Sequence, residues 1–523
     1  MNLLTDELLR VQASSGLYTM SLPALMSALG RDDVVSLPGI QRHQEDAFHV
    51  FLCYLAGVIL SRRGHTDSAQ PEEYWLKGLR ELTGEVGDDA WMLVVNDPCK
   101  PAFMQPPIPI EDHGRLKVKA RTPDELDLLP TAKNHDLKQA RATCSTPDGW
   151  IYSLISLQTM SGYFGRGNPG ISRMNRGFGN RPLVELCHSI RPGQRWRDAV
   201  ERLHVHRGNV LAGAWGYDPQ GLVLTWLPQW DGKSSFSLTA LDPFYIEICR
   251  RVRLRGEGQI DLAEAVPCNA NRVDAKALNG VVGDAWHPID VGSTNDKALS
   301  ISPQGLTAQV LRRLVFADGI RLSGMQQPLT GKSETAWLSV SVLVRGQGTT
   351  DGYHEKRVPI PAHAQRRLLG STVPGDPLAT LSRSAIDYAG KMQNSVLKPA
   401  IFSLIQGGPD KVQLDRDSAQ SWWQRFGKIY TTRWSDAFFP WLWDVPTSFV
   451  EEDILKDWAR WLRTEALEVL NEAQAALPLH SGRHYRICVQ ANRMFWSALY
   501  SERNFPFLRE AKERNDERIA NTK

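Results

Sequence analysis

Hydrophobic and polar positions alternate with two different periods in the first two thirds of the chain. Short alternating runs at 222–227 and 337–344 predict β-strands, because successive strand residues face opposite sides of a sheet. Apolar residues at helical spacing predict helices at 47–60 and 307–315. Gly, Pro and Asn separate these short elements. This mixture predicts an α+β fold class for the region.

The pattern changes to long stretches of helical periodicity after residue 377. In one stretch Ile454, Trp458 and Trp461 recur at spacings of three and four, which places them on one helix face. Large aromatic residues at such spacing favour a packed core. Four helices are expected, at 382–404, 417–434, 451–477 and 482–503. The expected product is a four-helix bundle.

The Gly- and Pro-containing segment 370–377 separates the two patterns and favours a linker. A chain of 523 residues also exceeds the size of a single hydrophobic core, which stops growing at roughly 250–300 residues. We therefore expect a large mixed α/β N-terminal domain at 1–370. A C-terminal four-helix bundle at 378–523 should follow it.

Charge and cysteine content add little about partners but favour a cytoplasmic location. The net charge is only +3, so any nucleic-acid partner must be argued from local clusters. The longest apolar run, 50–60, is shorter than the ~20 residues that span a bilayer. Seven cysteines without a Cys-x-x-Cys pair are typical of reduced thiols in the cytosol. We expect a cytoplasmic protein without a membrane partner.

Motifs for catalysis are incomplete. Gly331-Lys332-Ser333 resembles the end of a P-loop, but Gln326 stands where that motif needs its first glycine. His204-Val205-His206 has no acidic or cysteine partner at a useful spacing, so we interpret it as a surface strand. We predict no enzyme activity, no catalytic residue, no metal and no cofactor. A carboxylate site assembled by tertiary structure would escape this search, so a metal-dependent nuclease stays as an alternative.

The stretch 162–181 contains six glycines, four arginines and no acidic residue. Glycine lets a backbone approach a polyanion closely, and the planar guanidinium of arginine fits phosphate. Tyr163, Phe164 and Phe178 interleave with them, unlike the residues of a plain Ser/Gly linker. The stretch indicates a nucleic-acid contact surface, with a flexible solvated loop as the alternative.

Three more segments carry clustered cations or short polar side chains. Segment 128–141 is basic and predicts either a nucleic-acid contact or the capped start of a helix. Segment 345–357 predicts a hairpin tip that could enter a groove, or a plain turn. The strand that carries Arg250, Arg251, Arg253 and Arg255 fits a phosphate track or a solvated edge strand.

Four short motifs, in this order along the chain, resemble one family. They are Met1-Asn2-Leu3-Leu4-Thr5-Asp6, Phe103-Met104-Gln105 with Ala102 in place of proline, Gly-Tyr-Phe-Gly-Arg-Gly at 162–167, and Ile246-Glu247-Ile248-Cys249. The family is CasA, the large subunit of the type I-E CRISPR surveillance complex, Cascade. The resemblance spans nearly the whole chain and includes a C-terminal bundle.

The resemblance implies a noncatalytic subunit of a ribonucleoprotein. It would recognise the protospacer-adjacent motif in double-stranded target DNA and promote the strand opening that forms an R-loop with the CRISPR guide RNA. It would also provide a docking surface for a recruited helicase-nuclease. The other implied partners are the backbone, cap and small helical subunits of Cascade. A purely structural RNA-binding scaffold is the further alternative.

The resemblance also implies roles for individual residues. The glycine loop that contacts DNA would be Gly165, Arg166, Gly167 and Asn168. The wedge, a hairpin tip inserted beneath the motif, falls at 347–350; register favours Thr350, while Gln347 is the available glutamine and Thr349 lies between them. A lysine finger is expected between Lys276 and Lys297. Contacts to the guide RNA end and cap subunit would come from Asn134, His135 and Lys138.

The chain departs from the family at one place that bears on metal binding. Some members carry a cysteine cluster after the Ile-Glu-Leu-Cys segment. Here Arg250-Arg251-Val252-Arg253 follows instead. We therefore expect no zinc at this position.

Overall fold

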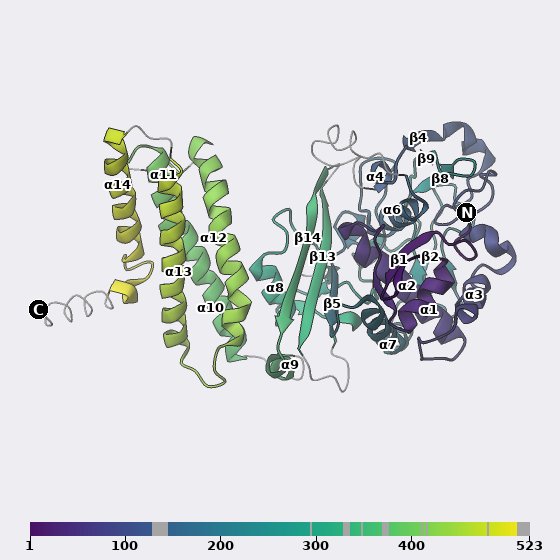
Figure 1. Ribbon diagram of the computed structural model, residues 1–523, viewed down its shortest axis with the longest axis horizontal. Coiled ribbons are helices and arrows are strands. Elements are labelled where there is room, and N and C mark those ends of the chain that lie inside the picture. Colours follow the sequence, from purple (N-terminus) through teal and green to yellow (C-terminus); the bar gives the residue numbers. More distant parts are fainter. Residues whose placement is uncertain are drawn as a thin grey trace, which may run out of the picture. The chain divides into compact units, whose positions relative to one another are not determined.

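The computed structural model describes residues 1–127, 145–292, 295–327, 335–346, 349–368, 376–408, 412–414, 417–477 and 481–509. The chain forms two compact units. One comprises Met1–Leu306 with Arg313–Leu369, and the other comprises Thr307–Arg312 with Gly370–Lys523. The α+β class with a C-terminal helical bundle, predicted from periodicity, is confirmed (Figure 1).

The core of the first unit is built around the long helix α2, Arg42–Arg62. Helices α6, Pro147–Met160, and α7, Pro192–Leu211, pack against it. Every α2 residue from Val50 to Leu60 is buried, which explains the continuous apolar run in the sequence. Helices α1, Leu22–Gly30, and α3, Glu72–Glu81, pack together at the same core.

Short sheets surround these helices (Figure 1). Strands β2, β1 and β3 form one sheet, β4, β9 and β8 a second, β14, β13 and β5 a third, and β11, β10 and β12 a fourth, in these spatial orders, while β6 pairs with β7 in parallel. Their bounds are β1 Leu9–Ala13, β2 Gly16–Met20, β3 Val34–Ser36, β4 Lys117–Ala120, β5 Leu183–Cys187, β6 Leu222–Leu224, β7 Leu241–Ile246, β8 Arg251–Arg255, β9 Leu262–Val266, β10 Ile289–Asp290, β11 Lys297–Ala298, β12 Ile320–Arg321, β13 Ala336–Gly346 and β14 Thr349–Ile360. Short helices α4 Pro123–Asp127 and α9 Ala362–Leu368 complete the mixed region, and helix α8, Ala308–Val315, begins in the second unit and ends in the first.

The longest sheet element is the antiparallel hairpin of β13 and β14. Its ladder runs from Ala336 opposite Ile360 to Gly346 opposite Thr349, with an irregularity at Val344 and Arg345. The strand predicted at 337–344 and the hairpin predicted after it are confirmed. The strand predicted at 222–227 is shorter, because the chain turns and the Leu227 N–H donates to the Leu224 carbonyl, 3.1 Å away.

The interpretation of His204-Val205-His206 as a strand is wrong. These residues lie in helix α7. The ring of His206 stacks on Phe244, and its Nε2 lies 2.9 Å from the Gly283 carbonyl oxygen. Val205 is 66% exposed, so this apolar residue does not belong to a buried face of the element. A run of three residues is too short to separate a period of two from a period of 3.6.

The second unit contains the predicted bundle. Its first helix consists of α10, Pro377–Lys391, a π-helical stretch, Met392–Leu397, and α11, Lys398–Ile405. Then follow α12 Asp417–Trp443, α13 Glu451–Ala475 and α14 Ser481–Leu499. Buried Trp458 donates its indole N–H to the Ala385 carbonyl at 3.0 Å, which ties α13 to α10. Helix α12 extends past its predicted end at 434, through Pro440, because buried Phe438, Phe439 and Leu442 continue its apolar face.

Candidate nucleic-acid interface

The glycine loop, Gly165–Asn168, is a hydrogen-bonded turn a few residues after helix α6. The Asn168 N–H donates to the Gly165 carbonyl, and the Phe164 N–H donates to the Asn168 carbonyl, both at 3.0 Å. Gly165 and Gly167 have φ of +94° and +87°, a region that side chains with a Cβ rarely adopt. A Cβ on Gly167 would also lie 2.9 Å from Cβ of Pro267. Both glycines are therefore required by the shape of the turn.

The arginines of the 162–181 stretch divide into buried and exposed pairs. Arg173 and Arg181 are each 2% exposed. Oδ2 of Asp284 lies 2.6 Å from Nη2 of Arg181 and 3.6 Å from Nη1 of Arg173. Burial alone would raise the pKa of Asp284, but these guanidinium groups hold it well below its usual range. The expectation that these two arginines contact nucleic acid is wrong, because they fasten the stretch to the core.

Arg166 and Arg176 are exposed and line a pocket of about 410 Å³. Nε of Arg176 donates to Oδ1 of Asn279 at 2.9 Å. Arg166 forms no hydrogen bond or ion pair with any residue that the structure describes. The rings of Tyr163 and Phe178 pack with centroids 4.8 Å apart at the same pocket.

Lys276 lines this pocket as well, from the short 3-10 turn Lys276–Leu278. Asn269 and Asn271 add amide groups, and none of the described lining residues is acidic. The pocket therefore combines three cationic side chains, amides and an exposed aromatic edge, the composition expected of a nucleic-acid contact. Sequence reasoning missed the two asparagines and could not pair Lys276 with the loop, because about a hundred residues separate them along the chain.

The other lysine candidate, Lys297, does not line the pocket. It lies on strand β11, and its Nζ is 3.9 Å from Oδ2 of Asp290. The structure thus brings Lys276, and not Lys297, beside Arg166 and Gly167. Asn168 does not line this pocket either; it contributes to a second hollow.

Of the wedge candidates, Thr349 and Thr350 are described and Gln347 lies outside the described residues. Thr349 pairs with Gly346 and Thr350 with Arg345 in the β13–β14 ladder. Thr350 is only 8% exposed. Asn134, His135 and Lys138, expected at the guide RNA, also lie outside the described residues.

Arg251 and Arg253 of strand β8 form neither a phosphate track nor a solvated edge, because both are buried. Arg255 is partly exposed and pairs with Glu264 at 2.8 Å. Arg253 is fully buried and donates to the carbonyls of Lys100 and Val95 at 2.9 and 3.0 Å. Nη1 of Arg251, 2% exposed, lies 2.5 Å from Oδ2 of Asp112. Arg253 thus satisfies backbone carbonyls and Arg251 pairs with a carboxylate, so for these two arginines both interpretations of the strand are wrong.

No protein-family profile matches the chain, and no curated protein matches it. Solved structures do match. CasA of Thermus thermophilus superposes with a TM-score of 0.61 at 15% identity, covering 95% of this chain and 99% of that chain. Cse1 of Thermobifida fusca gives 0.61 at 13% identity, covering 95% and 96%. The CRISPR-associated protein Cse1 from Acidimicrobium ferrooxidans gives 0.59 at 14%, covering 95% and 97%.

This chain has the CasA fold. The CasA likeness takes in 95% of the residues, so it includes most of both the mixed unit and the bundle. The resemblance inferred from four short motifs is confirmed for the CasA fold. Within the described segments, no group of three or more His, Cys, Asp or Glu is placed to hold a metal ion. None of the described helices has the length and apolar character needed to cross a bilayer.

Proposed function

We propose that this chain is the large, noncatalytic subunit of a Cascade-type CRISPR interference complex. It recognises a short protospacer-adjacent motif in double-stranded target DNA and promotes strand opening for pairing with the guide RNA. The observation that carries the proposal is the glycine loop beside a pocket that gathers Arg166, Arg176 and Lys276 and whose described lining residues include no acid. The CasA fold supports it independently.

The loop geometry suits approach to a DNA groove. Glycines at 165 and 167 leave the turn without side chains at those positions, so its backbone can approach base edges closely. Exposed Arg166 can enter a minor groove, where it reads base edges and groove width. Lys276 and Arg176 provide cations for the flanking phosphates, which position the duplex without selecting its sequence.

The hairpin provides the wedge in this proposal. A buried threonine within a ladder is poorly placed to enter a groove, so we assign the wedge to Gln347 in preference to Thr350. Asn134, His135 and Lys138 contact the guide RNA end and the cap subunit. This assignment of Asn134, His135 and Lys138 rests on the family resemblance alone.

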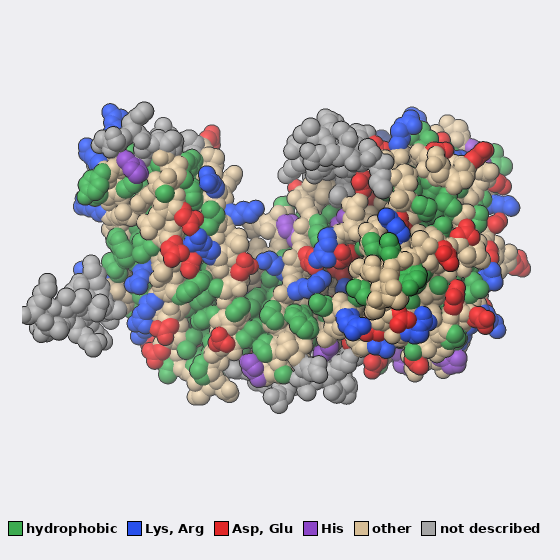
Figure 2. All heavy atoms as spheres, viewed as in Figure 1, with side chains coloured by type: hydrophobic (Ala, Val, Ile, Leu, Met, Phe, Trp, Pro, Cys, Tyr) green, Lys and Arg blue, Asp and Glu red, His purple; other side chains and the backbone are tan. Residues whose placement is uncertain are grey.

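The bundle contacts other subunits and nucleic acid. Helix α14 contains no acidic residue, and its exposed face carries Arg483, Arg486 and Arg493. Figure 2 shows Lys and Arg side chains along the part of the bundle where Figure 1 draws this helix. A basic helix face supports contact with a nucleic-acid strand. We assign small helical subunits, backbone subunits and the recruited helicase-nuclease as further partners, in a cytoplasmic complex.

The proposal is tested with the assembled complex and duplexes that differ only in the flanking motif. Arg166→Ala should weaken binding of the preferred motif by about fivefold or more, since a base-reading arginine contributes about 1–3 kcal/mol. Arg80→Ala is the matched control, because Arg80 is 46% exposed and pairs with Asp88 away from this pocket. Lys276→Ala should weaken binding more than Lys297→Ala. Parent-like affinity of both Arg166→Ala and Gln347→Ala at physiological salt would overturn the proposal.

Two outcomes would replace the proposal with another function. DNA cleavage that follows the purified chain in Mg²⁺ or Mn²⁺ would indicate a metal-dependent nuclease. Equal binding to all flanking motifs, together with co-purifying RNA subunits, would indicate a structural RNA scaffold.

A further inference from the structure

Two residues with a left-handed backbone, Arg176 and Asn279, contact each other beside the pocket that Arg166 lines. Their φ angles are +51° and +52°, a region that residues other than glycine rarely adopt. Nε of Arg176 donates a hydrogen bond to Oδ1 of Asn279 at 2.9 Å. Such strained residues persist only where the surrounding structure holds them, and they cluster at functional sites. The pair therefore indicates a contact whose geometry matters for function.

Asn279 connects three segments of the chain. Its N–H donates to the Lys276 carbonyl at 3.3 Å, which closes the turn that carries Lys276. Its carbonyl accepts from the Ala298 N–H on β11 at 2.9 Å, and its Nδ2 donates to the Asp296 carbonyl at 3.5 Å. Its Oδ1 accepts from Arg176 of the glycine-rich stretch. Every polar group of Asn279 thus binds another residue.

Gly280 brings the Lys276 turn directly against the backbone of the glycine-rich stretch. Its φ is +83°, and a Cβ there would lie 2.8 Å from the carbonyl carbon of Met174 and 2.9 Å from the carbonyl oxygen of Arg173. Only a residue without a Cβ allows this approach. Because the buried Arg173 pairs with Asp284, the turn packs on a segment that is fastened to the core.

The contact with Asn279 also orients the Arg176 guanidinium. Its Nε is occupied, while its Nη1 and Nη2 form no hydrogen bond or ion pair with a described residue. These two nitrogens remain available to phosphate oxygens, which suit the planar fork of a guanidinium. Arg176 and Lys276 are both exposed and line the same pocket.

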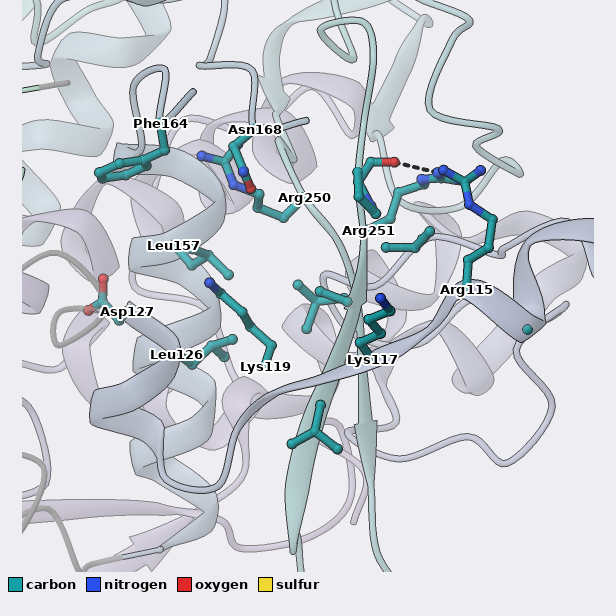
Figure 3. Close-up of a pocket in the computed structure, with 16 residues that line it drawn as sticks. Arg115, Lys117, Lys119, Leu126, Asp127, Leu157, Phe164, Asn168, Arg250 and Arg251 are labelled. Carbon is teal, nitrogen blue, oxygen red and sulfur yellow. Dashed lines mark hydrogen bonds between the residues drawn. The ribbon is translucent and has the colours of Figure 1, made fainter. Parts of the chain in front are cut away.

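The glycine loop itself does not hold the two cations. Figure 3 shows its Asn168, with the preceding Phe164, at a different hollow, which Arg250 also lines. Among the described residues, neither Arg176 nor Lys276 forms a side-chain hydrogen bond with the loop. Their placement beside the loop therefore depends on the Lys276 turn and on the hydrogen bond that joins this turn to Arg176.

We propose that Asn279 is a positioning residue for motif recognition, which sets the spacing between Lys276 and the guanidinium of Arg176. Asn279 does not line the pocket, so it acts through these two cations and does not touch the duplex. Without its side chain both cations keep their charge, but the hydrogen bond that fixes them relative to each other is lost. The inference rests on the proposed function, because it takes the pocket to be occupied by duplex DNA.

The test measures binding of the assembled complex to a duplex with the preferred motif. Asn279→Gly keeps the left-handed backbone without strain and removes only the side-chain hydrogen bonds. It should reduce the slope of log affinity against log salt by between about 0.9 and 1.8, since each phosphate contact contributes about 0.9 in B-DNA. Ala317→Gly is the matched control, because Ala317 also has a positive φ, +50°, and lies outside the pocket. It should keep the slope of the parent.

A double-mutant cycle separates positioning from folding. Independent sites combine to within about twofold, so a larger departure shows coupling. If Asn279 acts through Lys276, then Lys276→Ala should weaken binding clearly in the parent but by less than about twofold in Asn279→Gly. A merely structural role would lower Tm and leave the loss from Lys276→Ala unchanged.

A parent-like slope in Asn279→Gly, additive losses in the cycle, or the same slope change in Ala317→Gly overturns the inference. If Arg166→Ala and Gln347→Ala still weaken motif binding in that case, the proposed function stands without this role for Asn279.

Discussion

Single arginines in this protein take opposite roles that their sequence context does not reveal. Arg166 and Arg173 lie in the same glycine-rich stretch, yet the first is exposed and the second is buried beside Asp284. Tyr54 and Tyr245 enclose the Arg173 guanidinium, whose carbon lies 5.1 and 4.3 Å from their ring centroids. The buried pair holds the stretch in place so that the exposed residues keep a fixed position.

Removing the Asp284 carboxylate should therefore destabilise the first unit severely. Asp284→Ala leaves Arg173 and Arg181 buried without their counter-ion, a change that typically costs about 3–5 kcal/mol. Urea unfolding followed by tryptophan fluorescence measures the loss. Asp88→Ala is the control, because the Asp88–Arg80 pair is exposed and should contribute less than about 1 kcal/mol. Similar midpoints for the two variants would contradict the assignment.

Glu247, in the Ile246–Cys249 motif, makes stability depend on pH. Its carboxylate accepts from the Ser172 N–H and hydroxyl at 2.8 and 2.6 Å, which ties the glycine-rich stretch to β7 and its extension. Burial raises its pKa from the usual 4.5 to about 7, although the Ser172 hydrogen bonds act in the opposite direction.

The sign of this effect follows from the raised pKa. The folded state binds the Glu247 proton more tightly than the unfolded state does. The resulting contribution to the free energy of unfolding is therefore complete below about pH 4.5 and is lost as the pH rises through about 7. Glu247→Gln, which cannot ionise, should flatten the decline in Tm between pH 5 and pH 7.5. Glu257→Gln is an exposed control. An unchanged decline in Glu247→Gln would mean that other groups cause it.

Helices and strands long enough to repeat their hydrophobic pattern several times were predictable from the sequence, whereas short elements were not. The β13 strand and the helices at 417 and 451 each repeat their pattern several times, so tertiary packing did not change their type. The strand at 222 had too few residues to resist a local turn. Composition indicated the stretch 162–181, and the family resemblance placed the glycine loop within it. The pocket beside the loop depends on residues near 269 and 276, which only folding brings to it.

The β13–β14 hairpin is held near its middle by a polar group whose side chain is only 13% exposed. Asp46 on α2 accepts a hydrogen bond from the Ser341 hydroxyl of β13, and its Oδ1 lies 2.8 Å from Nη1 of Arg195 on α7. Glu185 on β5 also pairs with Arg195, at 2.9 Å. This network joins two helices and two strands, and it anchors the hairpin to which we assign the wedge.

Asp46→Asn should loosen the hairpin while leaving its volume unchanged. Hydrogen bonds to charged groups contribute about 1.5–3 kcal/mol, so amide protons of β13 should exchange about tenfold faster or more. Hydrogen exchange with mass spectrometry measures this. Glu355→Gln, which removes a pair with the 58% exposed Arg42 side chain, should leave exchange nearly unchanged. Equal protection in Asp46→Asn and the parent would argue against this anchor.

At the scale of the whole molecule, the second unit is not a continuous piece of chain. Residues Thr307–Arg312 belong to it, although both flanking segments belong to the first unit. Arg312 is fully buried and donates to the Ser382 hydroxyl at 2.8 Å and the Ala379 carbonyl at 2.9 Å. The neighbouring Arg313 instead pairs with Asp290 of the first unit at 3.1 Å.

These adjacent arginines allow a matched comparison. Arg312→Ala should increase hydrogen exchange in α10, because it leaves buried acceptors unsatisfied at a cost of about 1–3 kcal/mol. Arg313→Ala should leave α10 protected and affect β10 and β12 instead. The same exchange pattern in both variants would contradict the division of the chain at this point.

Because the second unit is made of two separate chain segments, it also limits how domains can be recombined between proteins of this fold. A chimera made by one crossover near residue 370 would join a foreign bundle to residues 307–312 of this chain, including Arg312. The acceptors at positions 379 and 382 would then come from one parent and their donor from another. Recombination of intact bundles between relatives therefore requires two transplanted segments, so the short segment and the long one should be inherited together.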